Sequence, residues 1–560
     1  MFASQISSKL KRRTGWFLLA GSGSAVLATS DEPNVKAARR ALRLGQTALL
    51  MVYDYQSSKY FGERDSNRQP IMQRVEECRA RLAKAQAIYS NNSHPQLSFA
   101  ERVQAKRHEK EAMLQVAQEL AQLQEELGPD PVHTRAAHRI LSLCHTNRGV
   151  YIKVGQHLAS LDYLIPPEYT TVLSALYDDN PRTSPEHVAQ IVKEELGQSP
   201  EEAFDFFDYT PMASASLAQV HVAYKNGRKL AIKIQHADLK ETAMGDIRAL
   251  VQVSRWAEEW FEGFTWGWIA REVEPLLPQE LDFSNEGRNA KCAAENFKRV
   301  GLRDVIVPAI VWEQTTSRVL TMHFEEGCKA TDTEAIAKQG IDKKKVANLL
   351  SSAFASQIFE SRCVHCDPHP ANVLLRAKNS RGDPELVLLD HGLYRELDAE
   401  FVLIYARLWK ALLLADIPGI QAACAQMGLE DMYTMFAALV TARPFDEVIE
   451  RSKNRWGKPR DKLNKRVDKT VMAGYAQRFL RQIMDLLARI PREMLLLLKT
   501  NDCLRHIDNA LGSPANTLLV TGRYAAATVY GHESGWWNRV LAWLDYMHIL
   551  LRIHLYHLTS

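Results

Sequence analysis

The stretch Val364-His-Cys-Asp-Pro-His-Pro-Ala-Asn-Val-Leu-Leu375, followed by an apolar run that ends in Leu388-Leu-Asp-His-Gly-Leu393, decides how this chain folds. Phosphoryl transfer from a nucleotide requires a carboxylate beside the attacking group, an amide oxygen on one Mg²⁺ and a second carboxylate on the other. Asp367, Asn372 and Asp390 supply these three groups. The stretch therefore predicts a site for Mg²⁺-nucleotide chemistry.

The spacing of these residues matches the protein-kinase catalytic loop. Four residues separate Asp367 from Asn372, as in H-R-D-x-x-x-x-N, and Asp390-His-Gly stands where Asp-Phe-Gly would follow. Upstream, Leu230-Ala-Ile-Lys233 matches the strand pattern that points a lysine at the α- and β-phosphates. The turn Lys225-Asn-Gly-Arg228 directly before it predicts a β-hairpin.

The glycine-rich loop that covers the phosphates in ordinary kinases is absent. No glycine occurs from Gln198 to Asn226, and Ala213-Ser-Ala-Ser-Leu-Ala-Gln-Val-His221 takes its place. Together with Lys153-Val-Gly-Gln156 and Glu280-Leu-Asp282, this loop makes the chain similar to the atypical kinases called the UbiB, ABC1 or aarF-domain family.

The resemblance covers roughly residues 133 to 400 and extends through Pro491-Arg-Glu-Met-Leu-Leu-Leu-Leu-Lys-Thr-Asn-Asp502. It is strongest to the mitochondrial branch of that family. It implies an α+β fold, bilobal and protein-kinase-like, with an N-terminal helical extension and a largely helical C-lobe. The implied cofactors are ATP or ADP and Mg²⁺.

The same resemblance assigns roles to individual residues. Asp367 is the expected catalytic residue, which steers the proton of the incoming nucleophile. Asn372 and Asp390 are the expected Mg²⁺ ligands. The residues expected to bind the nucleotide are Ala213, Ser214, Ala215, Ser216, Lys233, Glu286, Asn372 and Asp390.

Lys233 needs an acidic partner on a neighbouring helix. We predict Glu286 for this place, with Glu280 as the alternative, and we expect an inserted segment between Lys233 and that helix. Glu241 follows the lysine too closely to reach the end of a separate helix.

The Lys153-Val-Gly-Gln156 motif is expected on one long helix from about His133 to Leu161, where Lys153 and Gln156 share a face and Gly155 permits close approach by another backbone. By resemblance, this helix is a regulatory lid over the nucleotide cleft. Lys153 would there meet the carboxylates of Glu280 and Asp282, since burial of any of these charges alone would be costly.

Composition limits the classes of partner. The chain has 560 residues, 46% hydrophobic and 24% charged, and a net charge of +4, which gives no support to nucleic-acid binding. No acidic residue precedes Asp31, basic residues lie among serines, and an apolar run covers Trp16 to Ala28. We predict a mitochondrial targeting segment, with a secretory signal as the rival interpretation. The run is 13 residues long, short of the ~20 that a membrane span needs.

The eight cysteines form no compact disulfide framework. Cys363-Val-His-Cys366, with His369 nearby, could be read as a metal or redox site. A zinc site would need a second ligand pair at suitable spacing, and the catalytic-loop interpretation explains the same residues better.

The organisation follows from these motifs. The residues from Gln73 to Leu127 predict a helical hairpin inserted in the N-terminal extension. Ala48-Leu-Leu-Met-Val-Tyr53 is expected to pack in a core, with packing at a membrane surface as the alternative. The predicted parts are a targeting segment (1–30), an N-terminal extension (31–132), the lid (133–184), the N-lobe (185–323), the C-lobe (324–530) and a C-terminal amphipathic helix (531–560), which could dock on its own domain or lie on a membrane.

Two departures from ordinary kinases limit the function. Cys366 stands in the place of the catalytic-loop arginine, and no Ala-Pro-Glu follows Asp390. A kinase for a small or lipidic (isoprenoid) substrate, or an ATPase, therefore fits better than a protein kinase. The resemblance links such proteins to mitochondrial lipid and quinone homeostasis at the inner membrane. The alternatives are a nucleotide-sensing scaffold with little turnover and a membrane-shaping protein.

Overall fold

The computed structural model describes residues 32–61, 68–90, 108, 112, 115–116, 119–120, 122–123, 126–159, 165–177, 182–237, 239–260, 274–275, 277–441, 445, 486, 489–532 and 536–559. The predicted targeting segment lies outside these residues. The helices are α3 (Pro33–Phe61), α4 (Arg68–Ser90), α6 (Pro131–Asn147), α7 (Val150–Ala159), α8 (Pro167–Leu173), α9 (Pro185–Leu196), α10 (Pro200–Ala203), α11 (Leu239–Trp260), α13 (Phe283–Arg299), α14 (Thr333–Lys338), α15 (Lys343–Ser356), α16 (Ala399–Leu414), α17 (Ile417–Gln426), α18 (Tyr433–Thr441), α22 (Arg492–Ala510), α23 (Thr517–His532) and α24 (Trp536–Thr559). The strands are β1 (Phe206–Phe207), β2 (Ala213–Ser214), β3 (Ala218–Lys225), β4 (Arg228–Gln235), β5 (Val305–Ile306), β6 (Val319–His323), β7 (Cys328–Lys329), β8 (Cys363–His365), β9 (Val373–Ala377), β10 (Pro384–Leu388) and β11 (Tyr394–Glu396).

The N-lobe is built on an antiparallel sheet in the order β1-β3-β4-β6, with β2 paired to β3. Strands β3 and β4 form the predicted hairpin, whose turn residues Asn226 and Gly227 have φ of 51° and 72°. Positive φ at both positions is the geometry that Asn-Gly favours in a two-residue turn. The register places Lys233 on β4 between Val220 of β3 and Leu320 of β6, so the lysine lies inside the sheet.

The C-lobe contains a second sheet in the order β5-β10-β9-β7 and a separate β11-β8 pair. Because β9 and β10 are antiparallel with Val373 opposite Leu388, the residues just outside the pair, Asn372 and Asp390, reach the same edge. The backbone N–H of Leu389 donates to the carbonyl of Asn372 at 3.0 Å and closes that edge. Strand β5 departs from the predicted lobe boundary, because its residues lie in the range expected for the N-lobe yet pair in parallel with β10.

Helices α15, α16, α22 and α23 form the centre of the C-lobe. Helix α15 precedes the catalytic loop, and the turn that follows it, Gln357–Ser361, widens to a π turn and ends at Arg362 with φ of 56°. This turn leads directly into β8, which carries the start of the catalytic loop.

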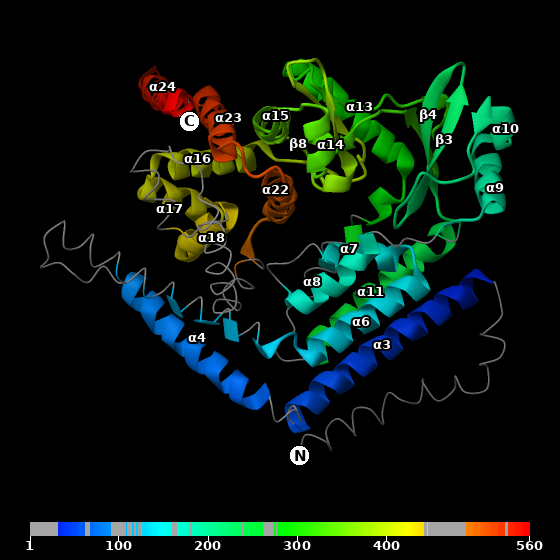
Figure 1. The fold of residues 1–560 in the computed structure, drawn as a ribbon, viewed down its shortest axis with the longest axis horizontal. Coiled ribbons are helices and arrows are strands. Elements are labelled where there is room, and N and C mark those ends of the chain that lie inside the picture. The colour runs from blue at the N-terminus through cyan, green and yellow to red at the C-terminus, as the bar shows by residue number, and fades with distance from the viewer. Residues whose placement is uncertain are drawn as a thin grey trace, which may run out of the picture.

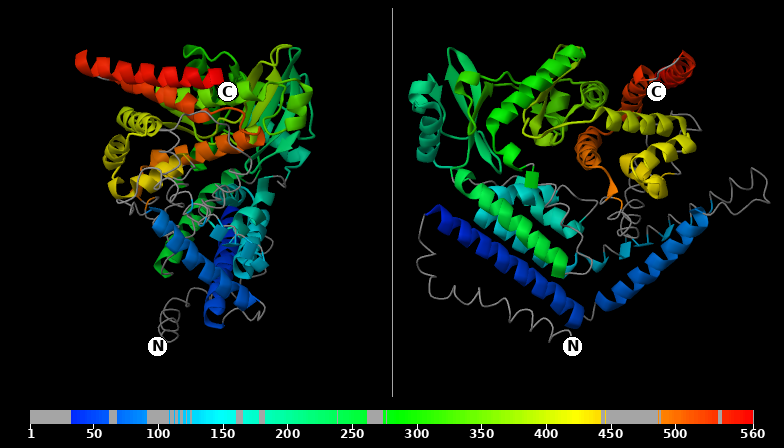
Figure 2. Two further views of the ribbon diagram at one scale, coloured as in Figure 1. Left: turned by 60° about the vertical axis from the view of Figure 1, so that its left-hand side comes forward. Right: turned by 180° about the vertical axis from the view of Figure 1, so that it is seen from behind.

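Below the two lobes, α3, α6, α7, α8 and α11 pack into a helical layer (Figure 1). Both views in Figure 2 show the same arrangement, with α7 on the side that faces the lobes. The prediction of a single long lid helix from about His133 is wrong, because this stretch forms two helices, α6 and α7. The helix breaks at Arg148 and Gly149, whose φ of 58° and 55° end α6 and turn the chain into α7.

The N-terminal extension meets the layer through α3, where Arg40 of α3 pairs with the buried Asp246 of α11 at 2.6 Å. The expectation that Ala48 to Tyr53 packs in a core is wrong for its large side chains. Leu49, Leu50 and Tyr53 are 57%, 50% and 68% exposed.

The predicted helical hairpin agrees with the described residues of the insertion. Val75, Cys78 and Leu82 of α4 bury their side chains against Leu120 and Leu123. An ion pair of 3.0 Å between Arg81 and Glu119 also joins the two limbs.

The C-terminal helix α24 docks on the C-lobe through the buried Ile549 and an ion pair of 2.5 Å between Lys410 of α16 and Asp545. Its outward side exposes large apolar residues, namely Trp536, Leu541, Trp543, Leu544, Met547 and Leu551. Among the described residues, none of the helices combines the length and the apolar character that crossing a membrane requires.

Candidate nucleotide and catalytic site

Lys233 and Glu286 form the ion pair at the N-lobe side of the site. The ammonium of Lys233 lies 2.8 Å from both carboxylate oxygens of Glu286. It also lies 3.6 Å from Asp390. Burial alone would lower the pKa of Lys233, but Asp390 and Glu286 outweigh it and raise the pKa above its ordinary value. Lys233 is therefore charged, and strand β4 holds it beside Glu286 and Asp390.

Glu286 reaches Lys233 because of how α13 begins. Asp282 caps this helix, since its side chain accepts a hydrogen bond from the N–H of Ser284 at 3.0 Å. Glu286 follows in the first turn and is buried. The segment inserted between Lys233 and this helix contains α11, where Glu241 lies exposed.

Asp390 and Asn372 lie at the shared edge of β9 and β10. One oxygen of Asp390 accepts a hydrogen bond from the N–H of Gly392 at 2.9 Å, and the other faces Lys233. Burial would raise the pKa of Asp390, but Lys233 and Lys153 hold it well below the usual range. Mg²⁺ prefers oxygen ligands and usually takes one or two from protein together with phosphates and water, and these two residues fit that donor set.

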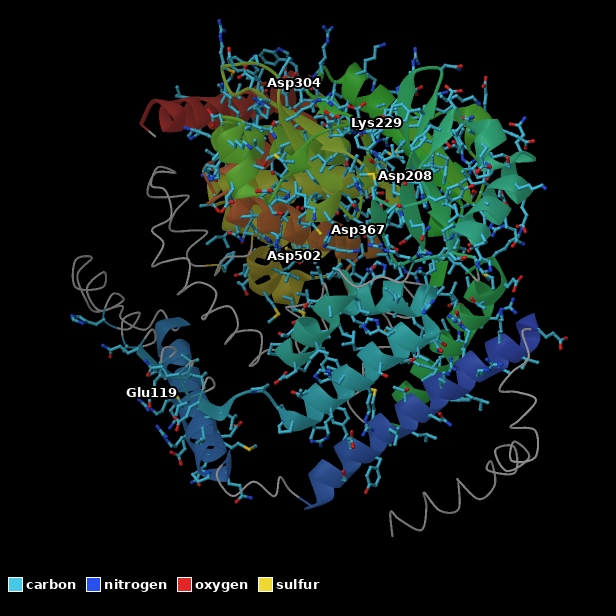
Figure 3. The ribbon with its side chains drawn as sticks, turned by 45° about the vertical axis from the view of Figure 1, so that its right-hand side comes forward. Glu119, Asp208, Lys229, Asp304, Asp367 and Asp502 are labelled. Atoms are coloured by element: carbon cyan, nitrogen blue, oxygen red, sulfur yellow. The ribbon has the colours of Figure 1, made fainter. Side chains whose placement is uncertain are left out.

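Asp367 lies beside α22, between the C-lobe and the helical layer (Figure 3). Each carboxylate oxygen faces a different lysine: Lys499 of α22 at 3.1 Å and Lys153 of α7 at 3.7 Å. Burial would raise the pKa of Asp367, but these lysines hold it far below its ordinary value. Asp367 is therefore a carboxylate at any physiological pH.

An ion pair, a hydrogen bond and close packing hold the lid helix α7 against the site. Lys153 pairs with Glu280 at 2.7 Å, and their attraction raises the pKa of Lys153 against the effect of burial. The amide of Gln156 donates to the carbonyl of Leu176 at 2.8 Å. Gly155 allows close approach, although the group that approaches is the side chain of Leu176 and not a backbone.

One expected contact of the lid is wrong. Asp282 was expected beside Lys153, but its carboxylate caps α13 and lies 3.4 Å from Arg288. The side chain of Asp282 caps the helix that brings Glu286 to Lys233. Of the two acidic residues, Glu280 is therefore the one that pairs with Lys153 of the lid.

The alanine-rich loop is tied in place from both sides. The N–H of Ala215 donates to the carbonyl of Ala218 at 2.7 Å. Its own carbonyl accepts a hydrogen bond from Nε2 of His236 at 3.0 Å. Ala213 and Ser214 form β2, and Ser216 is buried.

The residue that follows Asp390, His391, is buried and held by two polar contacts. His391 lies between the carbonyl of Leu388, 3.0 Å from Nε2, and the hydroxyl of Tyr394, 2.9 Å from Nδ1. Burial lowers its pKa to about 3. A neutral His391 therefore occupies the position of the phenylalanine in ordinary kinases, with His365 stacked on Tyr394.

The Cys363-x-x-Cys366 pair does not point into the site. Cys366 is buried, and burial raises its pKa to about 12. In the described part of the chain, no three residues among His, Cys, Asp and Glu are grouped as a metal site would require.

Sequence reasoning missed two residues of the site, Lys499 and His157. Lys499 lies in a stretch quoted above only for its resemblance, and His157 follows Lys153 by one helical turn. The spacing of His157 was a usable signal, since residues four apart on a helix are neighbours. Lys499 had no such signal, because the residues that it contacts lie far from it in the sequence.

The fold and the loop define a kinase-like protein. Two lobes flank a site in which a strand lysine, its helix glutamate and the Asp–Asn–Asp set converge, so the predicted bilobal α+β fold is confirmed. The family model described as the ABC1 atypical kinase-like domain matches residues 175–424.

Curated relatives extend the similarity. An ABC1 protein of Arabidopsis thaliana is 38% identical over 428 residues, which cover 74% of this chain and 79% of that protein. AarF domain-containing protein kinase 1 of Xenopus laevis is 42% identical over 387 residues, covering 69% of this chain and 73% of that protein. The Mus musculus protein of the same name is 40% identical over 405 residues, covering 72% and 75%. The chain belongs to the ABC1, or aarF-domain, family of atypical kinases.

Proposed function

We propose that this chain binds ATP or ADP with Mg²⁺ and transfers or hydrolyses the γ-phosphate. The observation that supports it most is the Lys233–Glu286 pair at 2.8 Å with Asp390 at 3.6 Å. A charged lysine beside a metal-binding carboxylate suits the α- and β-phosphates and the ion that bridges them. When bound, Mg²⁺ would neutralise the charge that develops on the phosphates, held by Asn372 and Asp390.

The phosphoryl acceptor is proposed to be a small or lipidic molecule. After Asp390 the chain enters β11, which pairs with β8, and then α16. This short path leaves little chain to form a platform for peptides. We propose a role in mitochondrial lipid or quinone homeostasis at the inner membrane, consistent with the family and with the exposed apolar side of α24.

A second candidate is a nucleotide-sensing scaffold with little turnover. The observation that favours it is Lys153, which lies 3.7 Å from Asp367 and 2.7 Å from Glu280. A lid that places a cation on the catalytic carboxylate hinders the approach of a nucleophile.

Phosphate release by the purified protein, with and without vesicles that contain an anionic phospholipid, distinguishes the two. Asp367→Asn keeps size and polarity but removes the charge, so turnover should fall by about 10² to 10⁴, with Mg²⁺-nucleotide affinity within about threefold since Lys233, Asn372 and Asp390 remain. The matched control is Asp304→Asn, a half-exposed carboxylate paired with Lys378 and distant from Asp367 in Figure 3. Equal turnover in Asp367→Asn and parent would refute the assignment. Nucleotide binding without turnover under every lipid condition would favour the scaffold.

A further inference from the structure

Lys499 comes to the catalytic carboxylate from a helix outside the matched kinase-like domain. It lies on α22, and its ammonium is 3.1 Å from Oδ1 of Asp367. It is also 3.2 Å from Nδ1 of His157 on the lid helix. The side chain is 14% exposed, so this charge is largely withdrawn from water.

The catalytic loop itself supplies no cation to Asp367. Between Asp367 and Asn372 the sequence is Pro-His-Pro-Ala, and burial lowers the pKa of its His369, which disfavours the charged form of that ring. A buried carboxylate without a cation is strongly disfavoured. The positive charge must therefore come from other elements.

The two lysines that supply it differ in what else they bind. Lys153 is 2.7 Å from Glu280 but 3.7 Å from Asp367, so its stronger partner is Glu280. Lys499 is the nearer cation to Asp367. Because Lys153 belongs to the lid, any opening of α7 removes its charge from Asp367 and leaves that of Lys499 in place.

The fold fixes Lys499 on the same lobe as Asp367. Its neighbour Thr500 is fully buried, and the Thr500 hydroxyl lies 3.4 Å from the carbonyl of His365, two residues before Asp367. Leu497 and Leu498, the two residues before Lys499, are buried in the C-lobe core. The ammonium is thus held to the catalytic loop by a rigid helix.

We propose that Lys499 is a positioning residue, which holds the carboxylate of Asp367 oriented toward the nucleophile once the lid lysine has moved away. This inference rests on the proposed phosphoryl-transfer function. It assigns α22 a role in the site. When the lid is closed, His157 of α7 contacts the ammonium of Lys499 that also contacts Asp367.

The first test is the kinetics of ATP hydrolysis by the full chain. Lys499→Met should lower kcat by about 10- to 100-fold and leave KM for ATP within about threefold, because it disturbs Asp367 while Lys233, Asn372 and Asp390 remain. Lys499→Arg should restore kcat, since it keeps the charge. Lys410→Met, which removes the α16–α24 ion pair, is the matched control and should leave both constants unchanged. An unchanged kcat in Lys499→Met overturns the proposal.

The second test needs no turnover. Thermal midpoints of Lys499→Met, Asp367→Asn and the double variant should not add: the double variant should lose clearly less than the sum, because each single change takes away the nearest opposite charge of the other residue and the double change removes both charges. Lys499→Gln repeats the cycle if Lys499→Met fails to fold. Additive losses overturn the role of Lys499. Absent turnover in the parent refutes the proposed function instead, so the two failures are distinguishable.

Discussion

Gly155→Ala tests whether the close packing of the lid helix α7 against Leu176 and Cys144 controls access to Asp367. A Cβ at this position would overlap Cδ1 of Leu176 and stand 3.0 Å from Sγ of Cys144. Both neighbours are buried in one cluster with Tyr151 and Ile152, so neither can swing into solvent. The added methyl group must therefore displace α7 or strain its packing.

The expected size of the effect follows from overpacking. Inserting a methyl group into a packed interior costs about 1 to 3 kcal/mol. If opening of α7 relieves the strain, the same free energy raises the open population by about 5- to 150-fold. Opening takes Lys153 away from Asp367, so ATP turnover should rise while the global fold is retained.

Hydrogen exchange of the backbone amides of residues 150–159 measures the opening directly, and phosphate release measures its consequence. Gly245→Ala is the matched control, since it is also a helical glycine but its added Cβ meets only Cβ of Ala37 at 3.5 Å. That variant should be neutral or more stable by up to about 1 kcal/mol, because alanine favours the helix. Unchanged exchange in α7 of Gly155→Ala would refute the packing argument. Faster exchange with no gain in turnover would refute the lid as a barrier to chemistry.

Further outcomes follow from the same geometry. Lys233→Ala and Asp390→Asn should each reduce the thermal stabilisation by Mg²⁺-nucleotide, and unchanged shifts in both would contradict the site. Because Lys233 and Lys153 overcome burial and hold the pKa of Asp390 low, that stabilisation should fall on acidification only where the nucleotide phosphates take up protons, at about pH 6, and a loss that begins above about pH 7 would count against an ionised Asp390. Ala215→Gly should alter the preference between ATP and ADP, since glycine admits backbone angles that alanine resists; equal affinity ratios in variant and parent would contradict it. A fluorescent reporter fused to residues 1–40 should enter mitochondria, whereas its secretion would establish the rival signal.

The parts of the site that sequence could predict are those set by short-range geometry. The hairpin turn fixed the strand of Lys233, and the antiparallel β9–β10 pair brought Asn372 and Asp390 to one edge. The choice of Glu286 over Glu280 also agreed with the geometry, because a residue at the start of a helix after an Asp cap points back to the sheet. Each of these outcomes depends on a few neighbouring residues.

The parts that sequence could not predict depend on packing between distant segments. The break between α6 and α7 follows from two positive φ angles at Arg148 and Gly149, and Gly149 also faces Leu239 of α11, whose Cδ1 would lie 2.9 Å from an added Cβ. Nothing in the residues next to Lys499 indicated that its ammonium meets Asp367, because that contact joins two distant segments. Glu280 pairs with Lys153 whereas Asp282 caps α13, and the motif alone does not show where α13 begins.

The charge state of Asp367 is consequently a property of the whole chain and not of its kinase-like domain. The matched domain covers residues 175–424, whereas the two lysines at Asp367 come from residues 153 and 499. A segment confined to the matched residues would contain Asp367 but neither cation. The two lysines lower the pKa of Asp367 in the full chain, so this effect would be lost without the lid and α22. The lid and α22 therefore belong to the catalytic unit, and they act on it through the same carboxylate from two sides.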